Sequence, residues 1–261
     1  MTEEELLKQN PWKDVELGLL YDSEPKYFYK DDEVAIKNFN VSSDEDNKLI
    51  LNIPPEPWQG NPLKAKVIFL SLNPGYIDNV NHKLAKVLQT DEQLLKQMMA
   101  FKRSTLDLSS NSFMPEENSG EPIGTKDAIS MLGDWYWENG FRSLREAVCK
   151  GKYTEKQFYR DVAIMQFHAY SSKKYERVFP RKRDTLKSQE FTRKLIEFIS
   201  KNNPNTVFVI MRSSKKWNEF LGKLSIKKIE KESNSMCQAI SPNNLGEANF
   251  KELCKLLNSE M

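Results

Sequence analysis

Four short polar segments carry the side chains that could do chemistry in this 261-residue chain. Each follows a short apolar run, and they read NPGY (73–76), HAYSS (168–172), RSSKKW (212–217) and SPNNL (241–245). Their amide, imidazole, guanidinium and hydroxyl groups can bind a polar ligand or orient a water molecule. The amide of Asn73 cannot act as a strong general base, so we expect chemistry that depends on positioning.

The sequence lacks the motifs of several common enzyme classes. No GxGxxG, GxxxxGK[ST], HExxH or GxSxG occurs, which removes the usual support for a dinucleotide-binding protein, a P-loop NTPase, a zincin or an α/β-hydrolase. The two histidines, His82 and His168, are too few for a multi-histidine metal site, and the three cysteines show no CxxC spacing. We therefore expect no metal, no cofactor and no disulfide framework.

The apolar runs before the polar segments are typical of strands that are buried on both faces. We predict such strands at about 66–72, 162–167, 206–211 and 235–240. Apolar periodicity predicts helices at about 3–8, 91–102, 126–138, 141–149, 186–201, from 214 onward, and 248–257. The alternation indicates a three-layer α/β/α fold with a central four-stranded parallel sheet in the order 2-1-3-4. All four polar segments would then meet outside the carboxyl ends of the strands.

The segment PPEPWQGNP (54–62) cannot continue a helix or a central strand, and it separates two predicted regions. Residues 1–55 form an acidic, aromatic-rich N-terminal appendage, with possible short strands at 34–39 and 48–53. Residues 56–261 form the main α/β domain. No apolar run approaches about 18 residues, and the N-terminus has no apolar signal segment. We therefore expect no membrane span and a cytoplasmic protein with reduced thiols.

The total charge is nearly balanced, with 39 Lys and Arg against 37 Asp and Glu. Its distribution is uneven, because residues 1–50 are mainly acidic whereas 173–194 and 212–231 are mainly basic. A basic face with an acidic appendage favours a polyanionic partner. The alternative is a pair of solvated helices with no partner.

The segment LSLNPGY (70–76) resembles the first motif of the uracil-DNA glycosylase superfamily, in particular its mismatch-specific and single-strand-selective branches. In that family a buried strand ends in an Asn-Pro-Gly loop. VFVIMRSSKKWNEF (207–220) is similar to the third strand and the following helix, and AISPNNLGEANFKEL (239–253) is similar to the last motif. The resemblance covers about residues 55–258 and implies a uracil-DNA glycosylase-like fold.

The resemblance further implies a DNA glycosylase that extrudes a damaged or modified base and hydrolyses its N-glycosidic bond. Asn73 would be catalytic, because its amide would hold a water against the anomeric carbon. The turn at Pro74 and Gly75 would point backbone N–H groups inward. The side chains implied to bind the base or enter the DNA stack are Tyr76, His168, Tyr170, Ser171, Arg212, Ser241, Asn243 and Leu245. Those expected to contact phosphates of duplex or single-stranded DNA are Lys173, Lys174, Arg181, Lys182 and Arg183.

Two departures from the family pattern leave other interpretations open. Relatives often have Asn at the end of the second strand, where this chain has His168 and Tyr170. The histidine that stabilises the departing base anion in relatives is absent from AISP (239–242). A catalytically silent relative that binds a nucleic acid or a modified base is therefore the second interpretation. The third is an unrelated α/β enzyme that acts on a small anionic molecule.

Overall fold

The computed structural model describes residues 1–17, 27–75, 90–110, 139–174, 186–231 and 239–259. Contacts within the chain divide it into two compact units. Unit 1 consists of Met1–Trp58, Leu72–Ser109 and Gln166–Phe198, and unit 2 consists of Gln59–Ser71, Ser110–Met165 and Ile199–Met261. The predicted boundary at residue 55 lies near the end of the first segment of unit 1, and the division into appendage and main domain remains a prediction.

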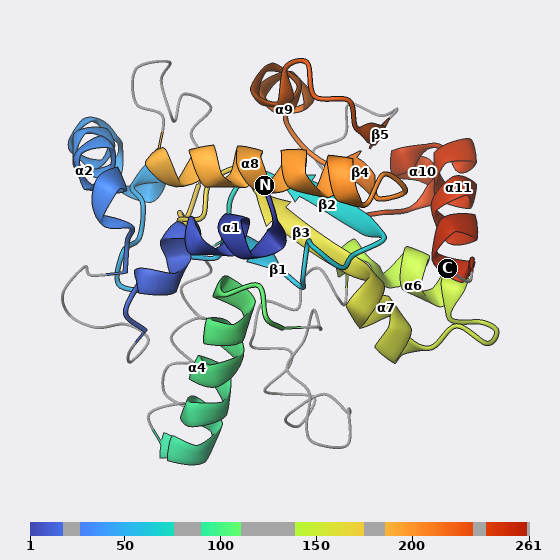
Figure 1. Ribbon diagram of the computed structural model, residues 1–261, viewed down its shortest axis with the longest axis horizontal. Helices are drawn as coiled ribbons and strands as arrows, with labels where there is room; N and C mark the ends of the chain where they lie inside the picture. Colours follow the sequence, from blue (N-terminus) through green and yellow to red (C-terminus); the bar gives the residue numbers. More distant parts are fainter. Residues whose placement is uncertain (18–26, 76–89, 111–138, 175–185, 232–238, 260–261) are drawn as a thin grey trace. The chain divides into compact units, whose positions relative to one another are not determined.

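The protein is an α/β protein whose described strands form a mixed five-stranded sheet in the order β1-β3-β2-β4-β5 (Figure 1). Every residue of β2, β3 and β4 is buried, which explains why their sequences are almost continuously apolar. β2 pairs in parallel with β4, and β4 pairs in parallel with β5. The strands are β1 (Trp58–Gln59), β2 (Val67–Ser71), β3 (Val162–Gln166), β4 (Val207–Ile210) and β5 (Lys227–Glu230).

The predicted sheet of four parallel strands in the order 2-1-3-4 is not the one observed. Its first three strands correspond to β2, β3 and β4 and lie in the predicted order, but the sheet also contains β1 and, beside β4, β5 at Lys227–Glu230, whereas most of the predicted fourth strand, 235–240, lies outside the described residues. Residues 232–238 lie outside the described part of the chain. Ile229 is the single buried residue of β5, which is the last strand in the order of the described sheet. An edge strand tolerates charged side chains, so β5 gives no apolar run in the sequence.

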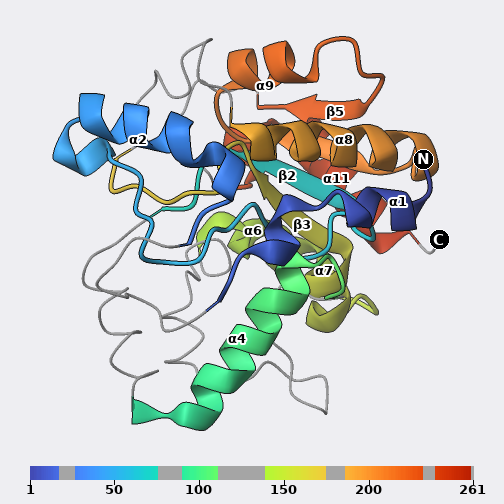
Figure 2. The ribbon, with the colours of Figure 1, turned by 60° about the vertical axis from the view of Figure 1, so that its left-hand side comes forward.

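Unit 2 has its core on one face of the sheet. Val67 and Phe69 of β2 pack in one cluster with alternate residues of β3 and β4, and Phe141, Phe158 and Leu253 cover them from the helices. α9 lies beside β5 (Figure 2), where the Asn218 side chain donates to Glu230 Oε1 at 3.1 Å. The helices of unit 2 are α6 (Arg142–Val148), α7 (Glu155–Asp161), α9 (Ser214–Leu221), α10 (Pro242–Leu245) and α11 (Glu247–Asn258).

Unit 1 is mainly helical, and it corrects the two strands expected in the first 55 residues. The segment 34–39 lies in a helix, because Ile36 and Phe39 are buried at a helical spacing of three. In the segment 48–53, Ile50 makes only an isolated antiparallel bridge with Ser171. The elements are α1 (Glu3–Lys8), η1 (Pro11–Asp14), η2 (Lys30–Asp32), α2 (Glu33–Ser42), η3 (Glu45–Asn47), α4 (Glu92–Leu106) and most of α8 (Lys187–Asn202).

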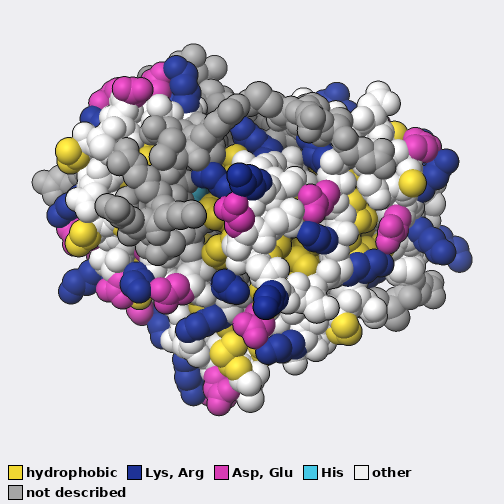
Figure 3. Space-filling model, turned by 90° about the horizontal axis from the view of Figure 1, so that it is seen from above, with side chains coloured by type: hydrophobic (Ala, Val, Ile, Leu, Met, Phe, Trp, Pro, Cys, Tyr) yellow, Lys and Arg dark blue, Asp and Glu magenta, His cyan; other side chains and the backbone are white. Residues whose placement is uncertain are grey.

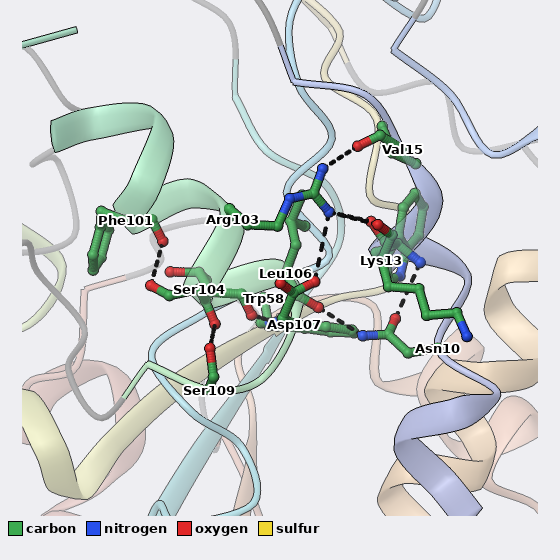
Figure 4. A network of polar contacts seen from close by, with 12 residues as sticks. Asn10, Lys13, Val15, Trp58, Phe101, Arg103, Ser104, Leu106, Asp107 and Ser109 are labelled. Carbon is green, nitrogen blue, oxygen red and sulfur yellow. Dashed lines mark hydrogen bonds and ion pairs between the residues drawn. The ribbon is translucent and has the colours of Figure 1, made fainter. Parts of the chain in front are cut away.

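The side chain of Arg103 holds the N-terminal segment of unit 1 against the end of α4 (Figure 4). Its Nη1 donates to the carbonyl oxygens of Trp12 at 3.1 Å and Lys13 at 2.8 Å, and its Nη2 donates to that of Val15. Asn10 Nδ2 donates to the carbonyl oxygen of Leu106 at 2.7 Å. These bonds join residues 10–15 to the last two turns of α4.

Two further findings concern the described residues alone. No helix among them has the length and apolar character that a membrane crossing requires. They also contain no cluster of three or more His, Cys, Asp or Glu side chains that could hold a metal ion.

Candidate functional site

The side chain of Asn73 lies two residues after the end of β2 and directly before Pro74 and Gly75. Its Nδ2 donates to Ser172 Oγ at 2.9 Å and to the carbonyl oxygen of Pro74 at 3.2 Å. Gly75 and Ser172 form an isolated parallel bridge, which fixes the two segments side by side. The amide is half-buried, and no hydrogen bond is made by its Oδ1 to any described residue. The fold therefore leaves Asn73 with one acceptor that a ligand or a water molecule can use.

Gln166, at the end of β3, is a functional candidate that the sequence reasoning missed. Its side chain is 1% exposed, and neither its Nε2 nor its Oε1 has a hydrogen-bond partner in the described structure. Burying an amide without partners costs free energy, so such a group calls for an explanation. The signal in the sequence was the single polar residue that interrupts the apolar run VAIMQF (162–167).

His168 is buried beside Asn73, because its backbone N–H donates to the carbonyl oxygen of Leu72 at 2.8 Å. Gln189 Nε2 lies 3.3 Å from His168 Nδ1 and also donates to the carbonyl oxygen of Phe167 at 2.7 Å. An amide nitrogen can only donate, so Nδ1 accepts and the ring proton of a neutral His168 is on Nε2. His168 is thus held as a hydrogen-bond donor through Nε2.

Tyr170 is a buried packing residue, which corrects its expected place in the binding surface. It is 1% exposed, and its hydroxyl donates to Asp32 Oδ2 at 2.8 Å and accepts the backbone N–H of Tyr29 at 3.1 Å. Burial raises the pKa of Tyr170, and the neighbouring Asp32 raises it further. Burial also raises the pKa of Asp32, although hydrogen bonds from Ser188 and Tyr170 oppose that shift. Tyr170 therefore connects η2 with the segment after β3.

The last two polar segments, 212–217 and 241–245, whose side chains were expected to bind the base or enter the DNA stack, belong to unit 2. Arg212 is half-buried directly after β4, and the next residue, Ser213, has a left-handed φ of 54° that only glycine adopts readily. The carbonyl oxygen of Ser241 accepts the backbone N–H of Leu245 at 2.9 Å. Asn243 is exposed, whereas Leu245 is completely buried in the core. A DNA wedge must protrude, so the structure contradicts that role for Leu245.

The predicted phosphate contacts are described only in part. Lys173 and Lys174 are exposed, and Lys174 Nζ forms an ion pair with Asp46 at 2.6 Å that raises the pKa of the lysine. On the face seen in Figure 3, Lys and Arg side chains are interspersed with Asp and Glu side chains. A continuous basic face therefore remains a prediction. The candidates that lie outside the described residues are Tyr76, Arg181, Lys182 and Arg183.

The side chains that unit 1 brings together at the ends of β2 and β3 are neutral hydrogen-bonding groups. Asn73, His168 and Ser172 lie close to one another through the contacts given above, and Ser171 follows in the same segment with 5% exposure. Such a set suits a neutral polar ligand better than an anion. Comparison of the chain with protein-family models, curated proteins and solved structures found no match.

Proposed function

We propose that this protein is a DNA glycosylase of the uracil-DNA glycosylase type, with a three-layer α/β/α fold, that hydrolyses the N-glycosidic bond of a damaged or modified base. The observation that carries the proposal is the amide of Asn73 at the end of β2. Its nitrogen is used by Ser172 and Pro74, and its Oδ1 is left to accept a proton of a water molecule. A strand end is a rigid place for such a group, which favours precise positioning.

In the proposed reaction the sugar–base bond breaks with its electron pair passing to the base. The oxygen of the water forms the new bond to the anomeric carbon, and a proton from the water neutralises the base. Asn73 would orient this water, although an amide is too weak a base to remove its proton early. The sugar becomes cationic in the transition state, so orientation and electrostatics have to provide most of the rate enhancement.

The buried amide of Gln166 supports a nucleobase as the ligand. A glutamine side chain presents a donor and an acceptor side by side, and this pair matches the edge of a base. Gln166 has both groups without a described partner, so a base in contact with it would satisfy them. A small anion would satisfy only the donor, and this difference favours the glycosylase interpretation over an enzyme that acts on a small anionic molecule.

Release of base from oligonucleotides that carry a panel of lesions tests the proposal, with strand cleavage after alkaline treatment as the readout. We expect Asn73→Ala to slow release by about 10²-fold or more and Asn73→Asp to retain activity, because a carboxylate also accepts from water. Asn38→Ala, which changes an exposed amide on α2, is the matched control. Release by Asn73→Ala at the wild-type rate would overturn the proposal.

The second candidate is a binding module that recognises a nucleic acid or a modified base without cleaving it. The complete burial of Leu245 favours it, because one of the two proposed wedges is then unable to enter the DNA stack. DNA binding without base release from any lesion, by wild-type protein and by Asn73→Asp, would support the module and exclude the enzyme.

A further inference from the structure

The hydroxyl of Ser172 stands between the Asn73 side chain and a backbone carbonyl. Ser172 Oγ donates to the carbonyl oxygen of Lys174 at 2.7 Å and lies 2.9 Å from Asn73 Nδ2. A serine hydroxyl has one proton, and here the carbonyl of Lys174 takes it. Toward Asn73, Ser172 can therefore act only as an acceptor.

This arrangement permits one orientation of the Asn73 amide. If the amide were turned by 180°, Oδ1 would face the lone pairs of Ser172 Oγ and of the Pro74 carbonyl oxygen, with no proton between them. Nδ2 therefore faces both acceptors, and Oδ1 points away from them. We infer that Ser172 is a positioning residue that fixes Oδ1 of Asn73 as the acceptor for the attacking water. The inference rests on the proposed function.

Backbone hydrogen bonds on either side of Ser172 hold the segment that contains it in place. Ser172 itself is 4% exposed, and the carbonyl oxygen of Ser171 accepts the backbone N–H of Ile50 at 2.9 Å. The backbone N–H of Lys174 donates to the carbonyl oxygen of Asp46 at 2.7 Å. The Lys174 carbonyl that receives the Ser172 proton thus follows a segment whose backbone is hydrogen-bonded at Ser171 and at Lys174.

The equivalence of the two oxygens in a carboxylate gives a specific test. In the wild-type background, Ser172→Ala removes the shorter of the two hydrogen bonds that fix the amide, so we expect kcat for base release to fall about tenfold or more while the Kd for DNA changes less than about twofold. In the Asn73→Asp background, Ser172→Ala should change kcat less than about twofold, because either oxygen can accept from the water. Ser104→Ala is the matched control, since Ser104 Oγ also donates to a backbone carbonyl, that of Phe101 at 2.8 Å.

A second measurement reads the orientation without relying on activity. We expect the side-chain amide protons of Asn73 to exchange slowly in the wild-type protein and quickly in Ser172→Ala, as measured by NMR. An equal loss of kcat in both backgrounds, or unchanged amide exchange in Ser172→Ala, would overturn the inference, because Ser172 would then be only structural. If the wild-type protein releases no base from any lesion, the proposed function fails, whereas the exchange measurement still decides whether Ser172 fixes the amide.

Discussion

Replacement of Gln166 by methionine tests whether this buried amide is retained for a ligand. Both of its polar atoms are buried without a described partner, and each such group costs about 1–3 kcal/mol in the folded protein. Methionine has a similar length and no hydrogen-bonding requirement, although imperfect packing offsets part of the gain. We therefore expect Gln166→Met to raise the free energy of unfolding by about 1–3 kcal/mol. Since 1 kcal/mol corresponds to about 2–4 °C in a chain of this size, Tm should rise by about 2–12 °C.

Gln189→Met provides the matched control, because Gln189 is also a buried glutamine of unit 1. Its Nε2 donates to the carbonyl oxygen of Phe167 and contacts His168 Nδ1, so its loss should lower the free energy of unfolding by about 1–3 kcal/mol. Urea denaturation of the three proteins measures both changes. If Gln166→Met were destabilised as much as Gln189→Met, the reasoning would be refuted, since the Gln166 amide would then have partners in the unliganded protein.

The same substitution also tests recognition of the base, through the Kd for DNA that carries a modified base. If Gln166 contacts an extruded base, Gln166→Met should lose about 1–3 kcal/mol of recognition, which is about 5- to 150-fold in Kd. DNA that lacks the base at that position should bind both proteins equally. If Gln166→Met were stabilised but still recognised every modified base as wild type does, the Gln166 amide would not contact the base.

Three further predictions test the fold and the binding surface. Gly60→Ala should lower the free energy of unfolding by about 1–3 kcal/mol, because φ is +74° and the new Cβ would lie 2.6 Å from a backbone oxygen of β3. Gly75→Ala should change it little, since no described atom lies within 4 Å of that Cβ; urea denaturation distinguishes the two. Burial raises the pKa of Asp32 above 3.8, so the stability of wild type relative to Asp32→Asn should be greatest below pH 3.8 and should fall as pH rises through the raised pKa. A pH series of urea denaturations measures this trend, and a rise with pH would contradict it. Finally, joint neutralisation of three basic residues should reduce the slope of log K for duplex DNA against log[salt] by roughly 2–3, and an unchanged slope would leave them as solvated charges. These residues are Arg181, Lys182 and Arg183.

The sequence predicts the centre of the fold better than its edges. β2, β3 and β4 were predictable because a strand covered on both faces leaves a continuous apolar run. β5 was missed because its only buried residue, Ile229, lies among charged side chains. α2 was misread as a strand because Val34, Ile36 and Phe39 are β-branched or aromatic residues, which are enriched in strands. α7 was not predicted, although the capping box of Thr154 and Gln157 marks its N-terminus in the sequence.

The candidate site divides in the same way. The position of Asn73 followed from local pattern, since a polar residue after a buried strand must lie at the sheet edge. The burial of Tyr170 depends on Asp32, which is 138 residues away in the sequence, and no local pattern indicates such a pair. Whether the Gln166 amide has partners is likewise a property of the tertiary structure. Sequence reasoning therefore located the site but could not tell which of its polar groups are already satisfied.

The contacts of Arg103 and Asn10 also have a consequence for the order of events during synthesis. They join residues that are 88 to 96 positions apart in the chain. At a translation rate of about 5–20 residues per second, α4 follows the N-terminal turn by about 5–20 s. The partner of Gln9, Lys194 in α8, is 185 residues away and emerges later still. Residues 9–15 are therefore synthesised before α4 and α8 and reach their final contacts only when those helices follow, and during that interval Trp12 is a site that a chaperone can bind.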